Sequence, residues 1–419
     1  MREMKDSGIE WIGKIPHCWN TSKLKHLGQY INGYAFKPEE WGSKGVPIIR
    51  IQDLTGSNDN PNYFEGQIDK KYWVENGDIL ISWAATLDAF IWNKGNGWLN
   101  QHIFKAVPNR RIINYDFFFW MIKESMKNMN NDNKHGIFMQ HVTLSVFNNF
   151  TIPMPPLAEQ ERIAAFLDAE CAEIDAVLEK TRASIEEYKK LKQAVITQAV
   201  TKGIRGDRPM KDSGIEWIGD IPAEWGVVPH KRIMHKVKEI CEQYNGEDII
   251  SLTVNGVVKR DLTAGGKMPT SFDGYQYVEP NDLLLCLFDI DITPRCVGVV
   301  RDYGVTSPAY SRFVMHDGYY NAYYDYLLRM IDDNKVFVHL SKNLRSSLTE
   351  SDFGAIKACA PPLAEQKCIA AFLDARCDEI DALIAKKQQY LIEIENYKKS
   401  LIYEYVTGKK EVKTSVLAD

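Results

Sequence analysis

The sequence lacks the features by which several classes of protein are recognised. Its eight cysteines are scattered without a CxxC pair, which argues against a zinc framework or a disulfide scaffold. No apolar run approaches the roughly 18 residues of a membrane span. The first residues, MREMKDSGIEW, have no apolar core of a secretory signal. We therefore expect a cytoplasmic protein.

Basic residues are also fewer than acidic ones. The 419 residues carry 51 Lys and Arg against 56 Asp and Glu, which gives a net charge of −5. A protein that coats nucleic acid without regard to sequence needs a broad basic face, so this balance argues against that class. A protein that reads particular bases is still possible, because charge can be segregated on one surface.

Catalytic and nucleotide-binding motifs are missing as well. The chain has no GxGxxG and no Walker loop. The proline pairs that begin at Pro155 and Pro361 lack the preceding Asn or Asp of an adenine methyltransferase loop such as NPPY. His102 has no second His or Cys at ligand spacing, and the acidic-x-Lys pair Glu187 and Lys189 lies where alternating charge is typical of a solvated helix face. We expect no catalytic residue and no metal site in this chain.

The sequence does contain an internal repeat. The decapeptide MKDSGIEWIG begins at Met4 and again at Met210, and the motif PPLAEQ..IAAFLDA begins at Pro155 and again at Pro361. The two copies of each motif are 206 positions apart, so one long segment that contains both motifs is repeated as a whole. Each unit has a short lead, a variable body and a long helical tail.

The tails predict two long helices that form a coiled coil. Prolines stand where each helix would begin, and the apolar residues then keep a 4-3 spacing that Lys192 and Lys398 interrupt. Cys171 and Cys377 take equivalent positions and are interpreted as small buried hydrophobes. The predicted seam residues are Leu167, Cys171, Ile174, Leu178, Ile185, Tyr188, Val195, Leu373, Cys377, Ile380, Ile384, Leu391, Ile394 and Leu401.

The bodies predict strand-rich structure, because runs such as VPIIRI, GDILIS and DLLLCLF are punctuated by Gly, Asn, Asp and Pro. The expected fold class is α+β: two globular strand-rich α+β domains joined by two long antiparallel coiled-coil helices, with an internal pseudo-two-fold repeat. The expected parts are a first body at 1–155, a first helix at 156–203, a second body at 204–361, and a second helix with the C-terminal tail at 362–419.

The repeated motifs resemble those of the specificity (S) subunit of type I restriction–modification enzymes. The leads SGIEWIG.IP..W, the helices PPLAEQ..IAAFLDA...EIDA and the closing VTKG and VTGK carry this resemblance over the whole chain. The first body is also similar to family members at NGYAFKPEEW, GVPIIRIQDL, NGDILISWAATL and LNQHIFKAVPN. The second body has looser counterparts in VEPNDLLLCLF and VTSPAYSRF.

The resemblance implies a non-catalytic subunit that serves phage defence. In the family, each body is a target recognition domain that reads one half of a bipartite site in double-stranded DNA. The helices space the bodies and dock two modification (methyltransferase) subunits, which methylate adenine with S-adenosylmethionine. Restriction (translocase and nuclease) subunits add activity that needs ATP with Mg. The resemblance implies no cofactor in this chain and no membrane partner.

Candidate DNA contacts come from the bodies, since direct readout uses Arg or Lys for guanine, Asn or Gln for adenine, and hydroxyls or apolar groups elsewhere. Trp83 and Trp98 are interpreted as core residues in preference to stacking platforms for bases. In the first body the candidates are Lys37, Arg50, Gln52, Ser82, Thr86, Asn100, Gln101, His102 and Lys105. In the second body they are Thr253, Asn255, Lys259, Arg260, Lys267, Arg295, Tyr310, Ser311 and Arg312.

Two other functions fit parts of the sequence. A coiled-coil scaffold for protein interaction, without DNA specificity, agrees with the net acidity. Two divergent bodies on a common frame agree better with a bipartite DNA target, which requires such divergence. A nuclease or methyltransferase that acts alone is disfavoured by the missing motifs.

Overall fold

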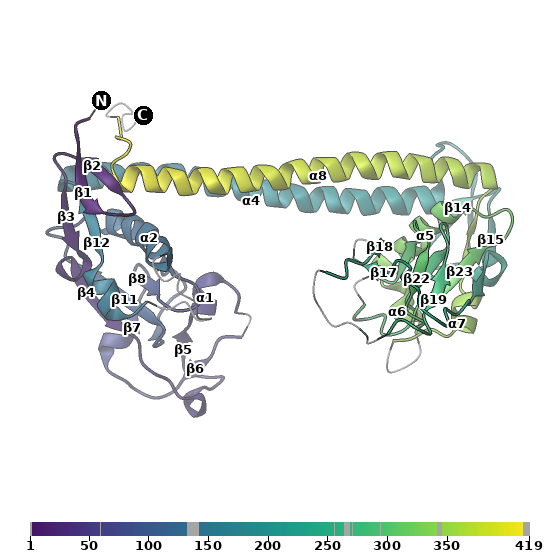
Figure 1. The fold of residues 1–419 in the computed structure, drawn as a ribbon, viewed down its shortest axis with the longest axis horizontal. Helices are drawn as coiled ribbons and strands as arrows, with labels where there is room; N and C mark the ends of the chain where they lie inside the picture. Colours follow the sequence, from purple (N-terminus) through teal and green to yellow (C-terminus); the bar gives the residue numbers. More distant parts are fainter. Residues whose placement is uncertain are drawn as a thin grey trace. The chain divides into compact units, whose positions relative to one another are not determined.

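The computed structural model describes residues 2–58, 60–131, 142–254, 256–263, 269, 271–293, 295–341 and 346–413. The chain divides into two compact units, Met1–Thr181 with Gln389–Asp419, and Arg182–Gln388. Each unit contains one body and one end of each long helix, α4 (Leu157–Lys202) and α8 (Leu363–Val406) (Figure 1). The boundary between the compact units therefore falls within each long helix. The four ranges expected from the sequence instead place each helix and each body in a range of its own.

The lead of each repeat forms a hairpin. In the first unit, β1 (Met4–Ile9) pairs antiparallel with β2 (Gly13–Pro16). Ile9, Ile12 and Ile15 are buried in this hairpin, where they join the core of the unit. The second unit has the equivalent hairpin, β13 (Met210–Asp212) with β14 (Asp220–Pro222).

The first body is built on two sheets and short helices. Its strands are β3 (Asn20–Lys23), β4 (Gly28–Asn32), β5 (Val46–Ile49), β6 (Tyr63–Phe64), β7 (Trp73–Val74), β8 (Ile79–Ser82), β9 (Asp88–Ile91), β10 (Gly97–Leu99), β11 (Ile103–Pro108) and β12 (Thr151–Met154). Its helices are α1 (Ile51–Thr55), α2 (Tyr115–Asn131), α3 (Leu144–Asn149) and the 3-10 turns Leu24–His26, Pro38–Glu40 and Lys70–Tyr72. One sheet has the order β4-β11-β8-β9, and the other has the order β6-β5-β10-β7 with β5 and β10 parallel. Strand β12 returns to pair with β3 just before α4 begins.

The second body has related strand connections despite its divergent sequence. Its strands are β15 (Gly226–Pro229), β16 (Met234–Val237), β17 (Ile250–Thr253), β18 (Gly256–Lys259), β19 (Gln276–Val278), β20 (Leu283–Leu285), β21 (Val297–Val299), β22 (Gly304–Thr306), β23 (Ser311–Met315) and β24 (Lys357–Ala360). Its helices are α5 (Asn321–Asp333), α6 (Val336–Leu340), α7 (Glu350–Ala355) and the 3-10 turn His230–Arg232. The sheet β16-β23-β20-β21 repeats the order of β4-β11-β8-β9, and β24 pairs with β15 as β12 pairs with β3. The bodies thus share a frame and differ in their side chains.

Both long helices begin after a proline pair and end at a glycine. Helix α4 starts after Pro156 and α8 after Pro362, whose rings suit the first turn of a helix. Gly203 and Gly408 follow the helices with φ angles of 74° and 71°, the left-handed conformation that ends a helix at low cost in glycine. Within each unit, the two helix ends lie side by side and run antiparallel (Figure 1).

The apolar seam faces inward along these helices. Nine of its members are buried, including Leu178 and Ile185 near the middle of α4, and five are half-buried. The buried members are Leu167, Cys171, Ile174, Leu178, Ile185, Leu373, Cys377, Ile380 and Leu401. The half-buried members are Tyr188, Val195, Ile384, Leu391 and Ile394. Burial raises the pKa of the Cys171 thiol to about 11.

The glutamate of the repeated LAEQ motif fastens the lead to the helix. Glu159 accepts a hydrogen bond of 2.9 Å from Trp19 Nε1 and forms an ion pair of 2.5 Å with Arg2. The second repeat has the same arrangement, with distances of 2.9 and 2.6 Å, in Trp225, Arg208 and Glu365. We call each set the lead clamp.

The glutamine of the same motif fastens the body to the helix. Gln160 Oε1 accepts a 2.8 Å hydrogen bond from the Asn114 backbone N–H, just before α2, and Gln366 Oε1 accepts one of 2.7 Å from Tyr320 N–H, just before α5. Both glutamines donate from Nε2 to the carbonyl of the first proline of the motif. The repeated sequence therefore supplies the joints between lead, body and helix.

Candidate nucleic-acid interface

Lys105 holds the first body together from inside. It lies on β11 opposite Leu80, and its Nζ is 2.6 Å from Asp78 Oδ2 and 2.9 Å from the Trp73 carbonyl oxygen. Its charge is thus satisfied within the body, next to the turn that precedes β8. A cation engaged in this way is a poor candidate for a base contact.

Arg312 takes the equivalent place in the second body. It lies on β23 opposite Leu284, is 5% exposed, and forms an ion pair of 2.6 Å between Nε and Asp282 Oδ2. Its Nη1 donates to the Tyr277 carbonyl oxygen at 2.9 Å. Burial raises the pKa of Asp282, although the Arg312 guanidinium and the Glu279 N–H counteract that rise. Arg312, like Lys105, is thus paired with an aspartate of its own body.

Several other candidates are also engaged within their own body. Ser82 and Asn100 are buried; the Ser82 hydroxyl donates to the Ala84 carbonyl oxygen at 3.2 Å. The Thr253 hydroxyl donates to the Gly256 carbonyl oxygen at 3.0 Å. Arg295 Nε donates to the Val297 carbonyl oxygen at 2.8 Å, and burial lowers the pKa of this guanidinium.

The two tryptophans lie in or against the core. Trp98 is buried and meets Trp73 edge to face at 4.8 Å between ring centroids. Trp83 stacks on Phe104 at 5.7 Å, and the ring of His102 lies 5.5 Å from it. These contacts agree with packing in preference to base stacking.

Arg50 has the geometry expected of a base-reading side chain. Its guanidinium lies over the indole of Trp41, with Cζ 4.7 Å from the ring centroid, and Trp41 is itself exposed. The Arg50 backbone N–H donates to Asp53 Oδ2 at 2.8 Å, which fixes the residue at the start of α1. Stacking on an aromatic face restrains the guanidinium and leaves its edge available for bidentate hydrogen bonds.

The remaining candidates of the first body are at the surface. Lys37, Gln52, Thr86 and His102 are exposed, and Gln101 is half-buried. Lys37 and Gln52 come from the two segments that flank β5, and Thr86 and the pair at 101–102 come from the ends of β8 and β11.

The candidates of the second body are less exposed. Lys259 is exposed and pairs with Asp248 at 2.6 Å. Arg260, Tyr310 and Ser311 are half-buried, and burial raises the pKa of Tyr310. Asn255 and Lys267 lie outside the described residues.

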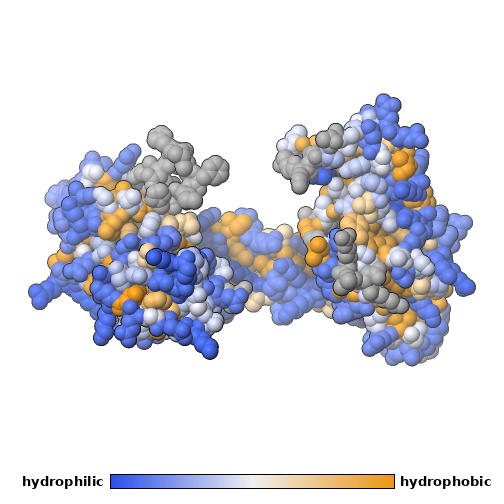
Figure 2. Space-filling model, turned by 90° about the horizontal axis from the view of Figure 1, so that it is seen from below, coloured by the Kyte–Doolittle hydropathy of each residue, from blue (hydrophilic) through white to orange (hydrophobic). Residues whose placement is uncertain are grey.

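Exposed apolar side chains in the second body are a feature that the sequence reasoning missed. Figure 2 shows apolar patches among the hydrophilic side chains of both bodies. Ile292 is 75% exposed and Val254 63% exposed, and Leu262 and Phe288 are also exposed. The sequence signal was the presence of apolar residues in segments rich in Asp and Gly, such as FDIDIT. Apolar groups of this kind can contact thymine methyl groups or wedge between base steps.

Neither a metal-binding cluster nor a membrane helix is found in the part of the chain that the structure describes. Across those ranges, His, Cys, Asp and Glu form no group of three or more that could hold a metal ion. Within the same ranges, no helix combines the length and the apolar character that crossing a membrane needs.

Comparison with known proteins gives consistent matches. A family model described as the type I restriction modification DNA specificity domain matches residues 16–187. The EcoBI specificity subunit of a type I restriction enzyme from Escherichia coli is 27% identical over 246 residues, which cover 57% of this chain and 52% of that protein. The MjaVIII specificity subunit of a type I restriction enzyme from Methanocaldococcus jannaschii is 26% identical over 424 residues, which cover 96% of this chain and 95% of that subunit.

The fold has a solved counterpart. A chain from structural work on complex assembly and conformational transition of the type I R-M system matches with a TM-score of 0.70 at 16% identity. The match covers 94% of this chain and 99% of that chain. The likeness shows the shared fold, with two strand-rich bodies and long helices.

Proposed function

Because the chain belongs to the family of type I restriction–modification specificity subunits, we propose that it selects the DNA sequence on which a modification complex acts. It carries no catalysis of its own. Each body reads one half of a bipartite target, and the helices space the two halves and dock the methyltransferase subunits. This function accounts for divergent bodies on a repeated frame, which a coiled-coil scaffold without DNA specificity leaves unexplained.

The observation that carries the proposal is the repeated set of joints around LAEQ. Glu159 and Glu365 hold the two leads, and Gln160 and Gln366 hold the two bodies, through equivalent hydrogen bonds. The sequence of each body is thus free to change, because its attachment does not depend on the side chains that face outward. Such a frame suits a protein that reads two different half-sites.

We propose a smaller set of base contacts than the sequence alone suggested. Lys105 and Arg312 are left out because each is paired inside its sheet, and Ser82 and Asn100 are left out because they are buried. In the first body the proposed contacts are Lys37, Arg50, Gln52, Thr86, Gln101 and His102. In the second body they are Thr253, Asn255, Lys259, Arg260, Lys267, Arg295, Tyr310 and Ser311, with the exposed Val254 and Ile292 as apolar contacts; Thr253 and Arg295 are retained because they are half-buried and not buried.

The proposed roles divide the chain at 1–155, 156–203, 204–361 and 362–419, as bodies and spacer helices in turn. The partners are double-stranded DNA, two modification subunits and, in the full enzyme, restriction subunits, all in the cytoplasm. S-adenosylmethionine binds to the modification subunits, and ATP with Mg serves the restriction subunits. An adenine methylated inside a duplex must be flipped out, so the contacts must tolerate distorted DNA.

Reconstitution tests this function. The purified chain alone should methylate no DNA, and the modification subunit alone should methylate none at a defined motif. Together they should methylate adenine within one bipartite motif, read by methylation-sensitive sequencing. Methylation by this chain alone, free of contaminants, would overturn the non-catalytic assignment.

A further inference from the structure

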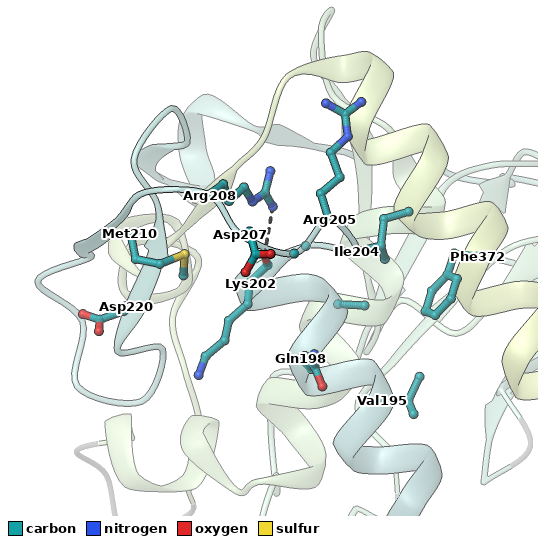
Figure 3. Close-up of a pocket in the computed structure, with 13 residues that line it drawn as sticks. Val195, Gln198, Lys202, Ile204, Arg205, Asp207, Arg208, Met210, Asp220 and Phe372 are labelled. Carbon is teal, nitrogen blue, oxygen red and sulfur yellow. Dashed lines mark hydrogen bonds between the residues drawn. The ribbon is translucent and has the colours of Figure 1, made fainter.

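A cavity of about 510 Å³ opens beside the end of α4 in the second unit (Figure 3). Four of its apolar side chains are Val195, Ala199 and Ile204 from α4 and the turn after it, and Phe372 from α8; Met210 of β13 also lines it. Phe372 is 37% exposed. We call these four residues the Phe372 socket.

The first unit shows what fits against such a phenyl ring. Phe166 is the repeat equivalent of Phe372, 206 positions earlier, and Tyr405 is the equivalent of Ala199. The rings of Phe166 and Tyr405 pack with their centroids 4.5 Å apart. The first unit thus covers its phenyl ring with its own tyrosine. The second unit has alanine there, which has no ring to offer.

The rim of the socket is polar and of mixed charge. Lys202, Arg205, Asp207 and Asp220 also line the cavity, and Figure 3 shows Lys202, Asp207 and Asp220 on the side away from Phe372 and Val195. Arg208 also lines it, but its guanidinium is held by Glu365 of the lead clamp. Nucleic acid would call for cations without carboxylates. An apolar centre with a rim of both signs is the composition of a protein–protein contact.

We propose that the Phe372 socket receives an aromatic side chain of a modification subunit. This inference rests on the proposed function, because the socket lies on the helices to which that function assigns the docking of methyltransferase subunits. The volume lies within the range of about 300–1,000 Å³ that is usual for ligand pockets. It accommodates a ring together with part of the segment that carries it. Aromatic anchors that fill a pocket contribute most of the affinity of many interfaces. The aromatic side chain of the modification subunit enters an open cavity in the second unit, whereas Tyr405 already covers the equivalent phenyl ring in the first unit.

Two substitutions test the socket in the full chain, with the modification subunit as the probe. F372A removes the ring, and A199Y supplies the tyrosine that the first unit carries. Each should weaken one of the two binding steps by about tenfold or more, the effect of losing an interface anchor. F372Y keeps a ring and A199S keeps a small side chain, so both matched controls should bind like the native chain. Native mass spectrometry and titration calorimetry report the number and the affinity of bound subunits.

The outcomes separate this inference from the function on which it rests. Native-like binding of both subunits to F372A would overturn the socket and leave the proposed function standing. If A199Y does not fold, F372A alone tests the proposal. Phe372 is partly exposed, so removing its ring disturbs little of the core. A native chain that binds no modification subunit would contradict the function and the socket together. Self-association of the native chain that F372A abolishes would assign the socket to a second copy, and that too contradicts the proposal.

Discussion

Lys398 on α8 places its Nζ 2.6 Å from Asp175 Oδ1 on α4. The other repeat has the same pair with the helices exchanged, since Lys192 on α4 lies 2.6 Å from Asp381 on α8. The lysines are 206 positions apart, and so are the aspartates. The one charged interruption of each apolar seam is therefore met by a repeat-equivalent carboxylate. Such polar positions in a seam commonly fix the alignment of helices at some cost in stability.

Replacing both seam lysines by leucine should leave the free energy of unfolding unchanged or raise it. The side chains of Asp175 and Asp381 are 59% and 55% exposed, so both carboxylates stay hydrated after the lysines are replaced. Exposed ion pairs of this kind contribute about 0–1 kcal/mol, and leucine restores the seam. Denaturant unfolding of K192L/K398L, beside the exposed control K189L, measures the difference. A loss of more than about 2 kcal/mol would show that the pairs are major stabilising contacts.

Removing Glu365 should cost far more. E365A leaves the indole N–H of Trp225 without its acceptor and leaves the guanidinium of Arg208 with only the exposed Glu224 as a carboxylate partner, and the side chains of Arg208 and Glu365 are only 10% and 9% exposed. Breaking a buried pair on one side costs about 3–5 kcal/mol. The control E379A breaks an exposed pair with Arg376 and should cost less than about 1 kcal/mol. If urea unfolding shows that both variants lose the same free energy of unfolding, the lead clamp does not fasten the lead to the helix.

Arg50 should contribute to sequence reading, and Arg312 to stability. R50A should weaken binding to the cognate site by about 1–3 kcal/mol and relax one position of the methylated motif. W41A should act in the same direction with a smaller effect, because the guanidinium loses its support. R312A should lower thermal stability instead. If R50A weakens binding to all sequences and lowers the salt dependence, Arg50 contacts phosphate and the base-reading role is wrong.

His230 should make the second unit sensitive to acid. The imidazole is fully buried against Phe353, and this desolvation lowers its pKa to about 4, although the Phe353 carbonyl oxygen at 3.3 Å counteracts it. Between the unfolded pKa near 6.5 and the folded value, the unfolded chain binds a proton that the folded chain does not. Stability is therefore complete above the unfolded pKa and falls on acidification, by roughly 2–3 kcal/mol from pH 7 to pH 4.5.

The variant H230Q isolates this contribution, because glutamine does not titrate. Unfolding free energies of the native chain and of H230Q at several pH values should diverge in slope below about pH 6.5. Parallel curves would mean that His230 does not remain neutral in the folded chain.

The helices were the part of the fold that the sequence predicted best. Proline pairs, a 4-3 apolar spacing and closing glycines all act locally, so their positions translate directly into α4 and α8 and into a seam that faces inward. The strands of the second body were harder to recognise, since its runs are short. Their order follows from long-range pairing, such as β16 with β23, that no local pattern encodes.

The candidate contacts show what residue types alone leave open. Lys105 and Arg312 are the residue types that read guanine, yet each finds an aspartate that lies about 30 positions earlier in the chain, across the sheet. A residue type alone does not distinguish a free cation from a paired one. Conversely, Ile292 has no polar group and was not a candidate from the sequence. Only its 75% exposure in the structure identifies it as a candidate apolar contact.

Exchange of one body tests the central claim most directly. Residues 20–150 are replaced by the equivalent body of a relative, with the LAEQ joints and both helices unchanged, and the methylated motif is read by sequencing of genomic DNA. The account predicts that one half of the bipartite motif changes and that the other half stays as it was. A change in both halves, or in neither, would contradict the division of sequence reading between the two bodies.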